Sequence, residues 1–365
     1  MEIYVDALIL ESQLHGGIPR IFYEILPRMC NIESSLQVNL LIFGITLGSH
    51  PQHPRITHNV FQGPEFMRTY RGRGQKYLEK ARRLITRMGI SETQHKIWHS
   101  TYYSSLPFWK GPKVVTVYDL IYEKYPSLFI DADKVISDKR REVTQADAVI
   151  CISHSTKKDL HRYYKVADEK VHVIYPGFNP VFSSERIKIG GNQPFFLYVG
   201  SRAGYKGFRD LLKALVYGNI QSEIKLVVVG QPFSPEEKQA IEELKLKDRI
   251  TLRTNIPDVE LRFLYQHAIA FIYPSLAEGF GIPLLEAMAC ECPIVASHIP
   301  STIEVAKDIP IYFEPGSHES LHTALDQALR EGLRASKGIE GLDRVNDFSW
   351  DKTAQATLDV YHSLL

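Results

Sequence analysis

Two successive series of short β-branched runs, separated by helical stretches, constrain the fold of this chain more than any other feature. We expect strands at 2–6, 37–43, 96–99, 113–117, 147–152 and 171–174, and then at 195–199, 224–229, 249–252, 269–273, 293–296 and 310–313. Short runs that alternate with amphipathic helical stretches are typical of parallel βαβ units. The sequence therefore predicts an α/β protein in which each series forms its own doubly wound parallel sheet.

The segment 176–194, "PGFNPVFSSERIKIGGNQP", separates the two series. It concentrates Pro, Gly, Ser and Asn without periodicity, which is typical of a linker. At 365 residues, the chain also exceeds what one hydrophobic core usually supports. We expect a first domain over 1–180 and a second over 181–348, with a central cleft where they face each other. The amphipathic end, 349–365, would cross back and complete the first domain.

Composition narrows the class of protein. The 44% hydrophobic and 23% charged residues are those of a globular enzyme or binding protein. No apolar run reaches the roughly 18 residues needed to span a bilayer, and the first ten residues lack the basic start and cleavage site of a signal peptide. We therefore expect a cytoplasmic protein. Nucleic-acid binding is not favoured, because the net charge is +1 and the basic stretch lacks interleaved stacking aromatics.

The charge is unevenly distributed along the chain. Residues 1–180 carry 24 Lys and Arg against 18 Asp and Glu, and the remainder carries 19 against 24. Much of the excess lies in 67–90, where eight basic residues meet only Glu79. Two interpretations are open: a solvated basic helix, or a peripheral contact with anionic lipid at the inner membrane face.

The stretch "PSLAEGFGIPLLEAMAC", residues 274–290, carries the most specific pattern. Glu278 and Glu286 stand eight positions apart, with two glycines and Pro283 between them. The apolar run before the stretch would be a strand, and Pro283 suits the first turn of the helix that follows. Ligands of open parallel sheets bind at the carboxyl ends of the strands. There the glycines let a ligand approach the backbone, and the N–H groups of the helix start favour an anion such as a diphosphate.

The two carboxylates extend this hypothesis. Glu286, about one turn inside the helix, can accept hydrogen bonds from hydroxyls beside the phosphate, and Glu278 can reach hydroxyls on the other side. One carboxylate for a ribose and one for a sugar, with a diphosphate between them, describe a nucleotide sugar. A glycine-rich turn with a helix-start glutamate is the purely structural alternative.

This stretch resembles the retaining glycosyltransferases of the GT-B fold, family four (group 1 type), whose pattern is Glu, seven residues, Glu. The resemblance continues in the same order along the chain through "GGIPR", "VVTVYDL", "ADAVICISHSTKKDL", "FLYVGSRAGYKGFRDLLKAL", "LVVVGQP", "STIEV" and "FSW". It implies two Rossmann-like domains and retaining transfer of a hexose, of mannose or glucose type, from a nucleoside diphosphate sugar to a hydroxyl acceptor. The product would be a polysaccharide, a glycolipid or another glycoconjugate.

The resemblance also implies roles for particular residues of the second domain. Glu286 would bind the donor ribose and Glu278 a hydroxyl of the transferred sugar. In "GSRAGYKGF", Arg202 and Lys206 match the basic pair that holds the diphosphate, and Gly200 would lie on the donor side. The distal phosphate or the sugar would contact the backbone of four neighbouring residues, Gly279, Phe280, Gly281 and Ile282.

The chemistry of the leaving group also favours basic residues at these positions. Breaking a glycosidic phosphate bond leaves negative charge on the departing diphosphate, and a fixed cation stabilises that charge where it develops. A solvated surface charge is the alternative interpretation for a lysine or arginine in a loop.

The first domain offers weaker candidates. Gly16 and Gly17 stand between a strand and a helix, where a tight turn is as good an explanation as a phosphate cradle. In the family, this loop borders the donor phosphates and the acceptor site. Tyr118 and Asp119 follow a predicted strand and are candidates for the reacting centre. His99 ends the predicted strand 96–99 and is a candidate for the acceptor side, with a core or cap histidine as the alternative.

Tyr118 departs from the family pattern. Many relatives carry His at this position, a residue thought to contact the sugar and assist at the reacting centre. Tyrosine can donate a hydrogen bond, but with a reference pKa near 10 it would not serve as a base at neutral pH. A structural role for Tyr118 therefore stays open.

Two rival functions and one rival site remain. Asp131 and Asp133 have the spacing by which another glycosyltransferase fold holds Mg²⁺ or Mn²⁺, but a single such triplet is common, and we expect no metal and no cofactor beyond the donor substrate. A sugar-nucleotide epimerase of the same fold is one rival function, against which the long "EGFGIPLLE" match argues. A catalytically weakened nucleotide-sugar-binding protein is the other, and Tyr118 is its only hint.

Overall fold

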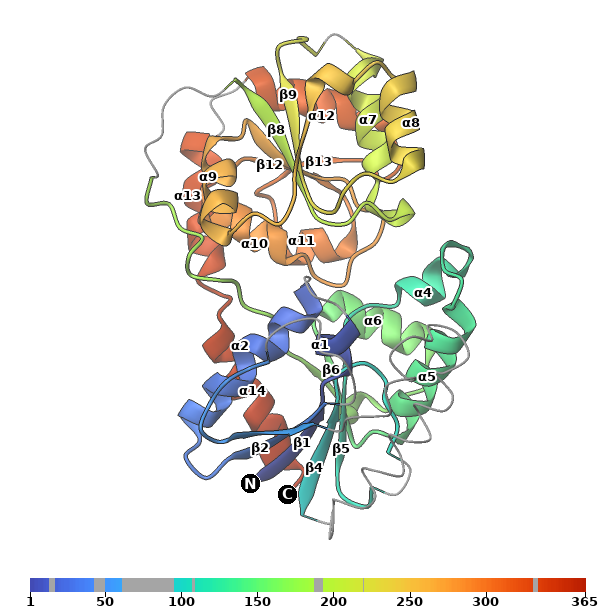
Figure 1. Cartoon of the computed structure of the whole chain (residues 1–365), viewed down its shortest axis with the longest axis vertical. Helices are drawn as coiled ribbons and strands as arrows, with labels where there is room; N and C mark the ends of the chain where they lie inside the picture. Colours follow the sequence, from blue (N-terminus) through green and yellow to red (C-terminus); the bar gives the residue numbers. More distant parts are fainter. Residues whose placement is uncertain are drawn as a thin grey trace. The chain divides into compact units, whose positions relative to one another are not determined.

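The computed structural model describes two compact units. The described residues are 1–12, 17–42, 50–60, 95–106, 109–186, 193–218, 220–330 and 334–365. The first unit comprises Met1–Gly177 together with Trp350–Leu365, and the second comprises Phe178–Ser349 (Figure 1).

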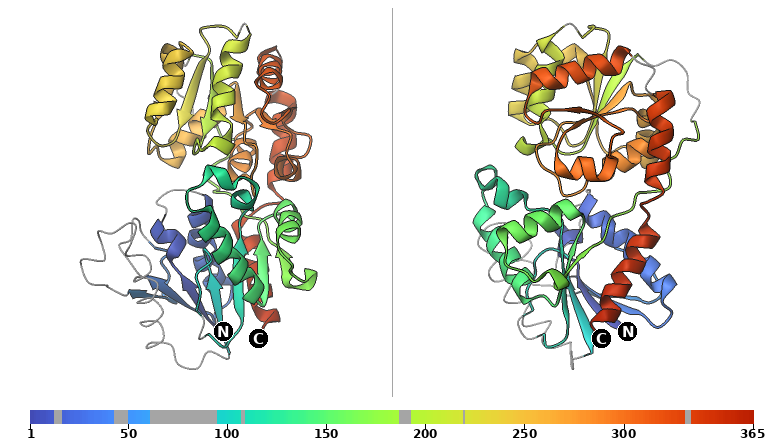
Figure 2. Two further views of the ribbon diagram at one scale, coloured as in Figure 1. Left: turned by 90° about the vertical axis from the view of Figure 1, so that its right-hand side faces the viewer. Right: turned by 180° about the vertical axis from the view of Figure 1, so that it is seen from behind.

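The first unit is a doubly wound α/β domain around a parallel sheet of order β3-β2-β1-β4-β5-β6-β7. Its strands are β1 (Glu2–Asp6), β2 (Gln37–Ile42), β3 (Ile56–Val60), β4 (Lys96–Ser100), β5 (Lys113–Val117), β6 (Ala148–Cys151) and β7 (Val171–Val173). Its described helices are α1 (Leu8–Ser12), α2 (Gly17–Ile32), α4 (Ile121–Lys124), α5 (Ala132–Gln145), α6 (His154–Tyr163) and α14 (Trp350–Ser363). Helices α2 and α14 pack side by side on one face of the sheet, and α5 and α6 lie on the other (Figures 1 and 2).

The second unit repeats this plan with a parallel sheet of order β10-β9-β8-β11-β12-β13. Its strands are β8 (Phe195–Val199), β9 (Lys225–Val229), β10 (Ile250–Arg253), β11 (Ala270–Tyr273), β12 (Ile294–Ser297) and β13 (Ile311–Phe313). Its helices are α7 (Phe208–Tyr217), α8 (Pro235–Glu243), α9 (Asp258–His267), α10 (Ile282–Ala289), α11 (Pro300–Ala306), α12 (His318–Arg330) and α13 (Arg334–Val345). The strand order reverses between β8 and β11, so the switch point of the sheet lies there.

The strands predicted from sequence are all present, and the α/β class is confirmed. Strands β6, β11 and β12 are buried at every position, and β1 and β5 at all but the first, which explains their continuous apolar sequence. The structure adds β3, which the sequence did not reveal. Of its five residues only Ile56 is buried, because β3 lies at the edge of the sheet. An edge strand with one apolar anchor has no period that a sequence pattern can detect.

Part of the segment predicted as a linker packs on the second unit. The ring of Phe182 meets Tyr265 of α9 edge-on, with centroids 5.9 Å apart. Gln266 of the same helix donates a 2.8 Å hydrogen bond from Nε2 to the carbonyl of Ser183. These contacts attach the start of the second unit, at 178–186, to α9.

His99 ties α14 to the core of the first unit. Its Nδ1 lies 2.5 Å from the hydroxyl of Tyr361 in α14, and its Nε2 lies 2.8 Å from the hydroxyl of Thr116. The ring is 1% exposed, and burial lowers the pKa of His99 to about 3. At the surface, an ion pair of 3.2 Å between Arg28 Nε of α2 and Asp351 Oδ1 of α14 joins these two helices. Helix α14, although last in sequence, is therefore part of the first unit's core.

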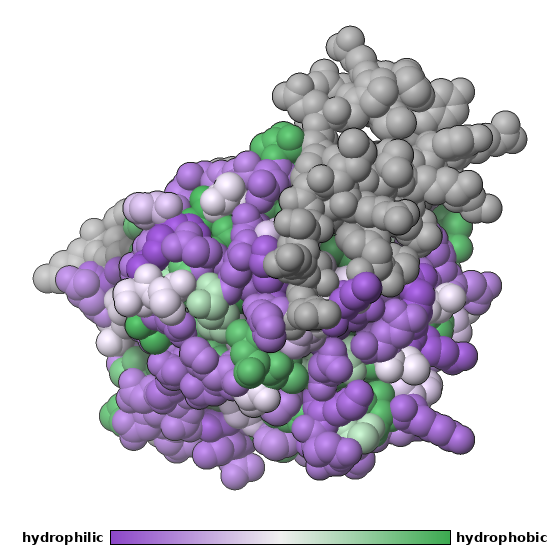
Figure 3. Space-filling model, turned by 90° about the horizontal axis from the view of Figure 1, so that it is seen from below, coloured by the Kyte–Doolittle hydropathy of each residue, from purple (hydrophilic) through white to green (hydrophobic). Residues whose placement is uncertain are grey.

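The surface is mostly polar where it can be seen from below. Apolar residues on that face lie in small separate groups among hydrophilic ones (Figure 3). None of the described helices combines the length and apolar character needed to cross a bilayer. The basic segment 67–90, on which the expectation of membrane contact rests, lies outside the described residues.

The buried histidine predicts a specific acid sensitivity. As the pH falls below about 6.5, unfolded chains protonate His99 while the folded protein resists protonation down to a pKa of about 3, so folding stability is lost with acid. In urea unfolding at pH 7, 6, 5 and 4, His99→Gln should show a shallower fall of the unfolding free energy than wild type. The difference should approach about 1.4 kcal/mol per pH unit, the value for one proton.

Equal slopes for wild type and His99→Gln would contradict the assignment of this acid sensitivity to His99.

Candidate functional site

The carboxyl ends of β8 and β11 bring two charged side chains together at the switch point of the second sheet. Lys206 lies in the loop after β8, and Glu278 lies in the loop after β11. The Lys206 Nζ donates to Glu278 Oε1 at 2.7 Å across 72 positions of sequence. Their side chains are 19% and 9% exposed. Because ligands of doubly wound sheets bind at this switch point, the pair marks the candidate site.

The two loops are pinned against each other by their backbones. Gly207 has φ +68°, and a Cβ there would lie 1.9 Å from the carbonyl oxygen of Pro274. A hydrogen bond of 2.7 Å from Leu276 N to the carbonyl of Tyr205 joins the same loops. Only glycine permits this approach, so position 207 fixes the distance between the loops that carry Lys206 and Glu278.

A second glycine starts the helix after β11. Gly281 precedes α10 with φ +111°, and a Cβ would lie 2.9 Å from Leu284 Cδ1. Pro283 occupies the first turn, as predicted. The side chains of Phe280 and Ile282 are buried, so these positions would offer a ligand their backbone. Gly279, between the glutamate and this turn, is also buried.

Glu286 lies in the second turn of α10. Its residue is 5% exposed, and its Oε2 accepts a 3.3 Å hydrogen bond from the hydroxyl of Tyr265. Burial and, secondarily, the Glu286 charge raise the pKa of Tyr265 well above its usual value, so the phenol stays a donor. Glu286 is thus held by α9 behind the helix start.

Two tyrosine side chains interact with Glu278. Burial raises the pKa of Tyr273 and of Tyr198, and in both cases the Glu278 charge adds to the effect. Tyr198 donates its hydroxyl to the carbonyl of Ser201 at 2.6 Å. Lys206 supplies the positive charge that balances Glu278 in this enclosed place. The pair can hold an anion at the ammonium and a hydroxyl at the carboxylate.

Arg202 does not join Lys206, although the sequence paired them. Its guanidinium binds Glu237 of α8, with Nε 2.9 Å from Oε1. The two cations of this loop therefore engage different carboxylates. Gly200, where the loop begins, has φ +123°, a conformation that favours glycine.

The candidates of the first unit have structural contacts. Tyr118 is 2% exposed and donates its hydroxyl to the carbonyl of Thr101 at 2.7 Å. Burial, with the nearby Asp6 charge as a second cause, raises its pKa well above the usual value. The contacts favour the structural interpretation of Tyr118 over a role at the reacting centre, because its hydroxyl is occupied inside the core. The same holds for His99, whose two ring nitrogens bond Tyr361 and Thr116 rather than facing an acceptor.

Asp119 and Gly17 lie at the starts of helices. Asp119 Oδ1 accepts a 3.0 Å hydrogen bond from the backbone N of Ile121, the first residue of α4. Gly17 is the exposed first residue of α2. Gly16 lies outside the described residues.

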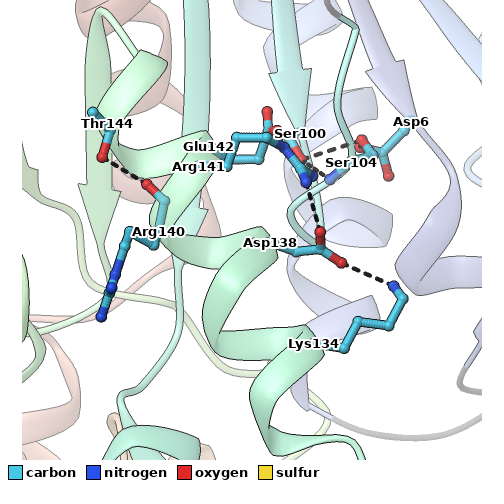
Figure 4. A network of polar contacts seen from close by, with 9 residues as sticks. All are labelled: Asp6, Ser100, Ser104, Lys134, Asp138, Arg140, Arg141, Glu142 and Thr144. Atoms are coloured by element: carbon cyan, nitrogen blue, oxygen red, sulfur yellow. Dashed lines mark hydrogen bonds and ion pairs between the residues drawn. The ribbon is translucent and has the colours of Figure 1, made fainter.

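The structure reveals a buried carboxylate that the sequence did not single out. Asp6 ends β1 and is 1% exposed. Its oxygens accept hydrogen bonds from Thr101 N at 2.8 Å, from Ser104 Oγ at 2.5 Å and from Leu8 N at 2.9 Å. Figure 4 shows Asp6 beside Ser104. The sequence signal was an acid at the end of an apolar strand, since Thr101 and Ser104 lie 95 and 98 positions away.

Helix α5 carries three further ionic contacts. Lys139 and Glu123 form a buried pair, with Nζ 2.9 Å from Oε2, and Lys139 also donates to the carbonyl of Asp119 at 2.9 Å. On the same helix, Arg141 bridges Asp138 at 2.7 Å and the buried Glu142 at 2.9 Å (Figure 4). The hydrogen bond from Lys139 anchors the loop that carries Asp119 to α5.

The aspartates with metal-like spacing lie at the start of α5. Asp131 precedes the helix and Asp133 is in its first turn. Within the described ranges, no three His, Cys, Asp or Glu side chains gather as ligands of a metal ion would.

Comparison with known proteins identifies the family. The model of Glycosyltransferase Family 4 matches residues 16–182, and the model of Glycosyl transferases group 1 matches residues 181–340. The chain belongs to the group 1, family 4 glycosyltransferases. The first match covers the strands of the first sheet except β1, the second covers all strands of the second sheet, and the Lys206–Glu278 pair falls within the group 1 match.

Individual relatives agree with this family. The chain is 30% identical over 213 residues to the O-antigen chain mannosyltransferase RfbU of Salmonella typhimurium, covering 58% of this chain but only 60% of that protein. Two solved structures are similar over the whole chain. Sucrose-phosphate synthase of Thermosynechococcus elongatus has a TM-score of 0.81 at 19% identity, covering 100% of this chain and 98% of that one. HepE of Anabaena, in complex with UDP and glucose, has a TM-score of 0.75 at 17% identity, covering 100% of both. The predicted GT-B fold is confirmed.

The packed loops of the candidate site predict unequal tolerance of alanine. Gly207→Ala should destabilise the protein more than Gly316→Ala. Both positions have positive φ, which costs about 1–2 kcal/mol for alanine. Only at 207 would the new Cβ meet a backbone oxygen, whereas at 316 the nearest atom would be 3.7 Å away. Urea unfolding of the two variants measures the difference, and equal losses would show that the loops are not pinned at Gly207.

Proposed function

We propose that the protein is a retaining glycosyltransferase that moves a hexose, of mannose or glucose type, from a nucleoside diphosphate sugar to a hydroxyl acceptor. The observation that carries the proposal is the Lys206–Glu278 pair at the switch point, beside the start of α10 and Glu286. The family and the relatives support it: RfbU is named a mannosyltransferase, and HepE was solved with UDP and glucose.

The donor would extend along the second unit. Its diphosphate would lie against the N–H groups at the start of α10, where the helix dipole favours negative charge. Lys206 would leave Glu278 partly or wholly to meet the phosphate, and Glu278 would then accept hydrogen bonds from the sugar. Glu286, one turn further along α10, would bind the ribose.

The proposed reaction separates charge across this site. As the bond between the anomeric carbon and the phosphate oxygen breaks, the diphosphate becomes more negative and the sugar ring gains positive character. Lys206 stabilises the first charge and Glu278 the second, and such fixed charges act most strongly in an enclosed site. The acceptor oxygen forms its bond on the face that the diphosphate leaves, and a leaving phosphate oxygen takes the acceptor proton, so the anomeric configuration is retained.

A panel of nucleoside diphosphate sugars tests the proposal. Each donor is incubated with the protein with and without candidate acceptors, after thermal-shift screening identifies the donor that binds. Transfer with retained anomeric configuration, read by NMR and unaffected by a chelator, is the expected result. An isomerised donor would instead indicate an epimerase, and binding without product would indicate a nucleotide-sugar-binding protein. A product with inverted configuration would show that the enzyme is not a retaining one. Loss of activity with the chelator would show that transfer depends on a metal ion.

Lys206→Ala should lower turnover by about two to three powers of ten, the scale for losing a charge partner of a transition state. Single-turnover measurement with saturating donor isolates this effect, and thermal unfolding checks that the fold is intact. Lys213→Ala, an exposed lysine on α7, is the matched control and should retain activity. A loss below about threefold in a folded Lys206→Ala variant would remove Lys206 from the site.

Replacing the two glutamates should affect different kinetic quantities. Glu286→Ala removes ribose hydrogen bonds present in both the ground state and the transition state, so donor binding should weaken by about 1.5–3 kcal/mol. Glu278→Ala removes a carboxylate that matters more as the sugar becomes positive, so its loss should fall mainly on turnover. Donor affinity and single-turnover rate of both variants separate these effects. Normal binding by Glu286→Ala together with normal turnover by Glu278→Ala would refute the assignment of the pair to one donor.

A further inference from the structure

Arg202 lies in the middle of the loop between Gly200 and Lys206, and its side chain is directed into the protein. The side chain is only 4% exposed. Its Nε and Nη2 atoms lie 2.9 and 3.1 Å from the two carboxylate oxygens of Glu237 in α8. This two-pronged geometry is the strong form of an arginine–carboxylate contact.

The turn after β9 encloses the rest of the guanidinium. Nη2 also donates to the carbonyls of Gln231 and Pro232 at 2.8 and 3.0 Å. The guanidinium carbon lies 4.8 Å from the centroid of the Phe233 ring, within the range of a cation–π contact. Arginine is thus used here for its planar fork and its stacking face, as well as for its charge.

The remaining nitrogen is closed off by a glycine. Nη1 is buried and makes no hydrogen bond to any described residue. It lies against Gly230, where a Cβ would be 3.0 Å from Nη1 and 2.6 Å from the carbonyl oxygen of Gly200. The start of the Lys206 loop and the turn after β9 are therefore in direct backbone contact around Arg202.

Glu237 joins this arrangement to the start of α8. Its Oε2 accepts from Ser234 N at 2.8 Å, and Ser234 Oγ accepts from Glu237 N at 3.2 Å, which together form a capping box. Moving Arg202 to a ligand would break its contacts to Glu237 and to the turn, and would leave a part-buried carboxylate without its cation. Lys206 has one carboxylate partner and a more exposed side chain, so it is the cation of this loop that a ligand can reach.

We propose that Arg202 is a positioning residue rather than a ligand of the donor diphosphate. Together with Glu237, it fixes the loop that presents Lys206. The proposal rests on the proposed function for the role of Lys206, and it leaves Lys206 as the cation of this loop that meets the leaving diphosphate.

A double-mutant cycle tests the proposal. Arg202→Ala, Glu237→Ala and the double variant should each lower kcat by a similar factor of about 10 to 100, the scale for misplacing a catalytic group by about 1 Å. The double variant should be no worse than either single one. Donor KM should stay within about threefold, because no contact to the donor is removed. Arg202→Lys should fail to restore kcat, since an ammonium cannot form the fork.

Two outcomes would show that Arg202 acts on the diphosphate directly. One is a Glu237→Ala variant that keeps full kcat while Arg202→Ala loses it, because removing Glu237 would only free the guanidinium. The other is rescue by Arg202→Lys. Ser234→Ala is the matched control for the capping box, and it should retain kcat. A kcat loss equal to that of Glu237→Ala would assign the effect to the helix cap and overturn the proposal.

Urea unfolding of the same variants separates this proposal from the proposed function. Non-additive stability changes in the cycle are expected whether or not sugar is transferred. Additive changes would overturn the positioning pair even in an active enzyme. A wild-type protein that transfers no sugar but shows the coupling would overturn the proposed function alone.

Discussion

The contact between Lys206 and Glu278 is the interaction on which the organisation of the second unit depends. Two charges so little exposed are tolerated only when they are matched, because an unpaired buried charge is costly. Their meeting requires β11 to lie beside β8, the arrangement that creates the switch point. It also requires Gly207, since any side chain there would strike Pro274 and separate the two loops. Sheet order, backbone conformation and charge therefore converge on one place.

The two units share one sheet arrangement, but the polar side chains at the carboxyl edges of their sheets have different partners. At the carboxyl edge of the first unit, several polar side chains are buried and bonded within the domain. Tyr118 bonds a backbone carbonyl, Asp6 bonds Thr101 and Ser104, and Lys139 pairs with Glu123. Satisfied buried networks of this kind make an edge rigid. At the carboxyl edge of the second unit, Lys206 and Glu278 are held by each other, and in the proposed function they would exchange that contact for the donor.

One loop shows how neighbours decide the use of a charge. Arg202 and Lys206 are four positions apart and look equivalent in sequence. Arg202 contacts a carboxylate, two carbonyls and an aromatic ring, so its guanidinium is engaged in contacts that stabilise the fold. Lys206 meets Glu278, which lies in the loop that leads into α10. The planar fork suits the first task, and a compact ammonium on a flexible stem suits the second.

Sequence alone determined the α/β class, twelve strands, the proline that opens α10 and the stretch that carries Glu278 and Glu286. These follow from local rules: continuous apolar runs mark buried strands, and glycine with proline marks the turn into a helix. Tertiary structure alone decided the edge strand β3, the buried hydroxyl of Tyr118, the core position of His99 and the partner of Arg202. Their reasons lie in residues far along the chain: Thr101 for Tyr118, Tyr361 for His99 and Glu237 for Arg202. A local pattern shows that a side chain can ionise or donate, but burial and long-range partners decide whether it faces a ligand or the core.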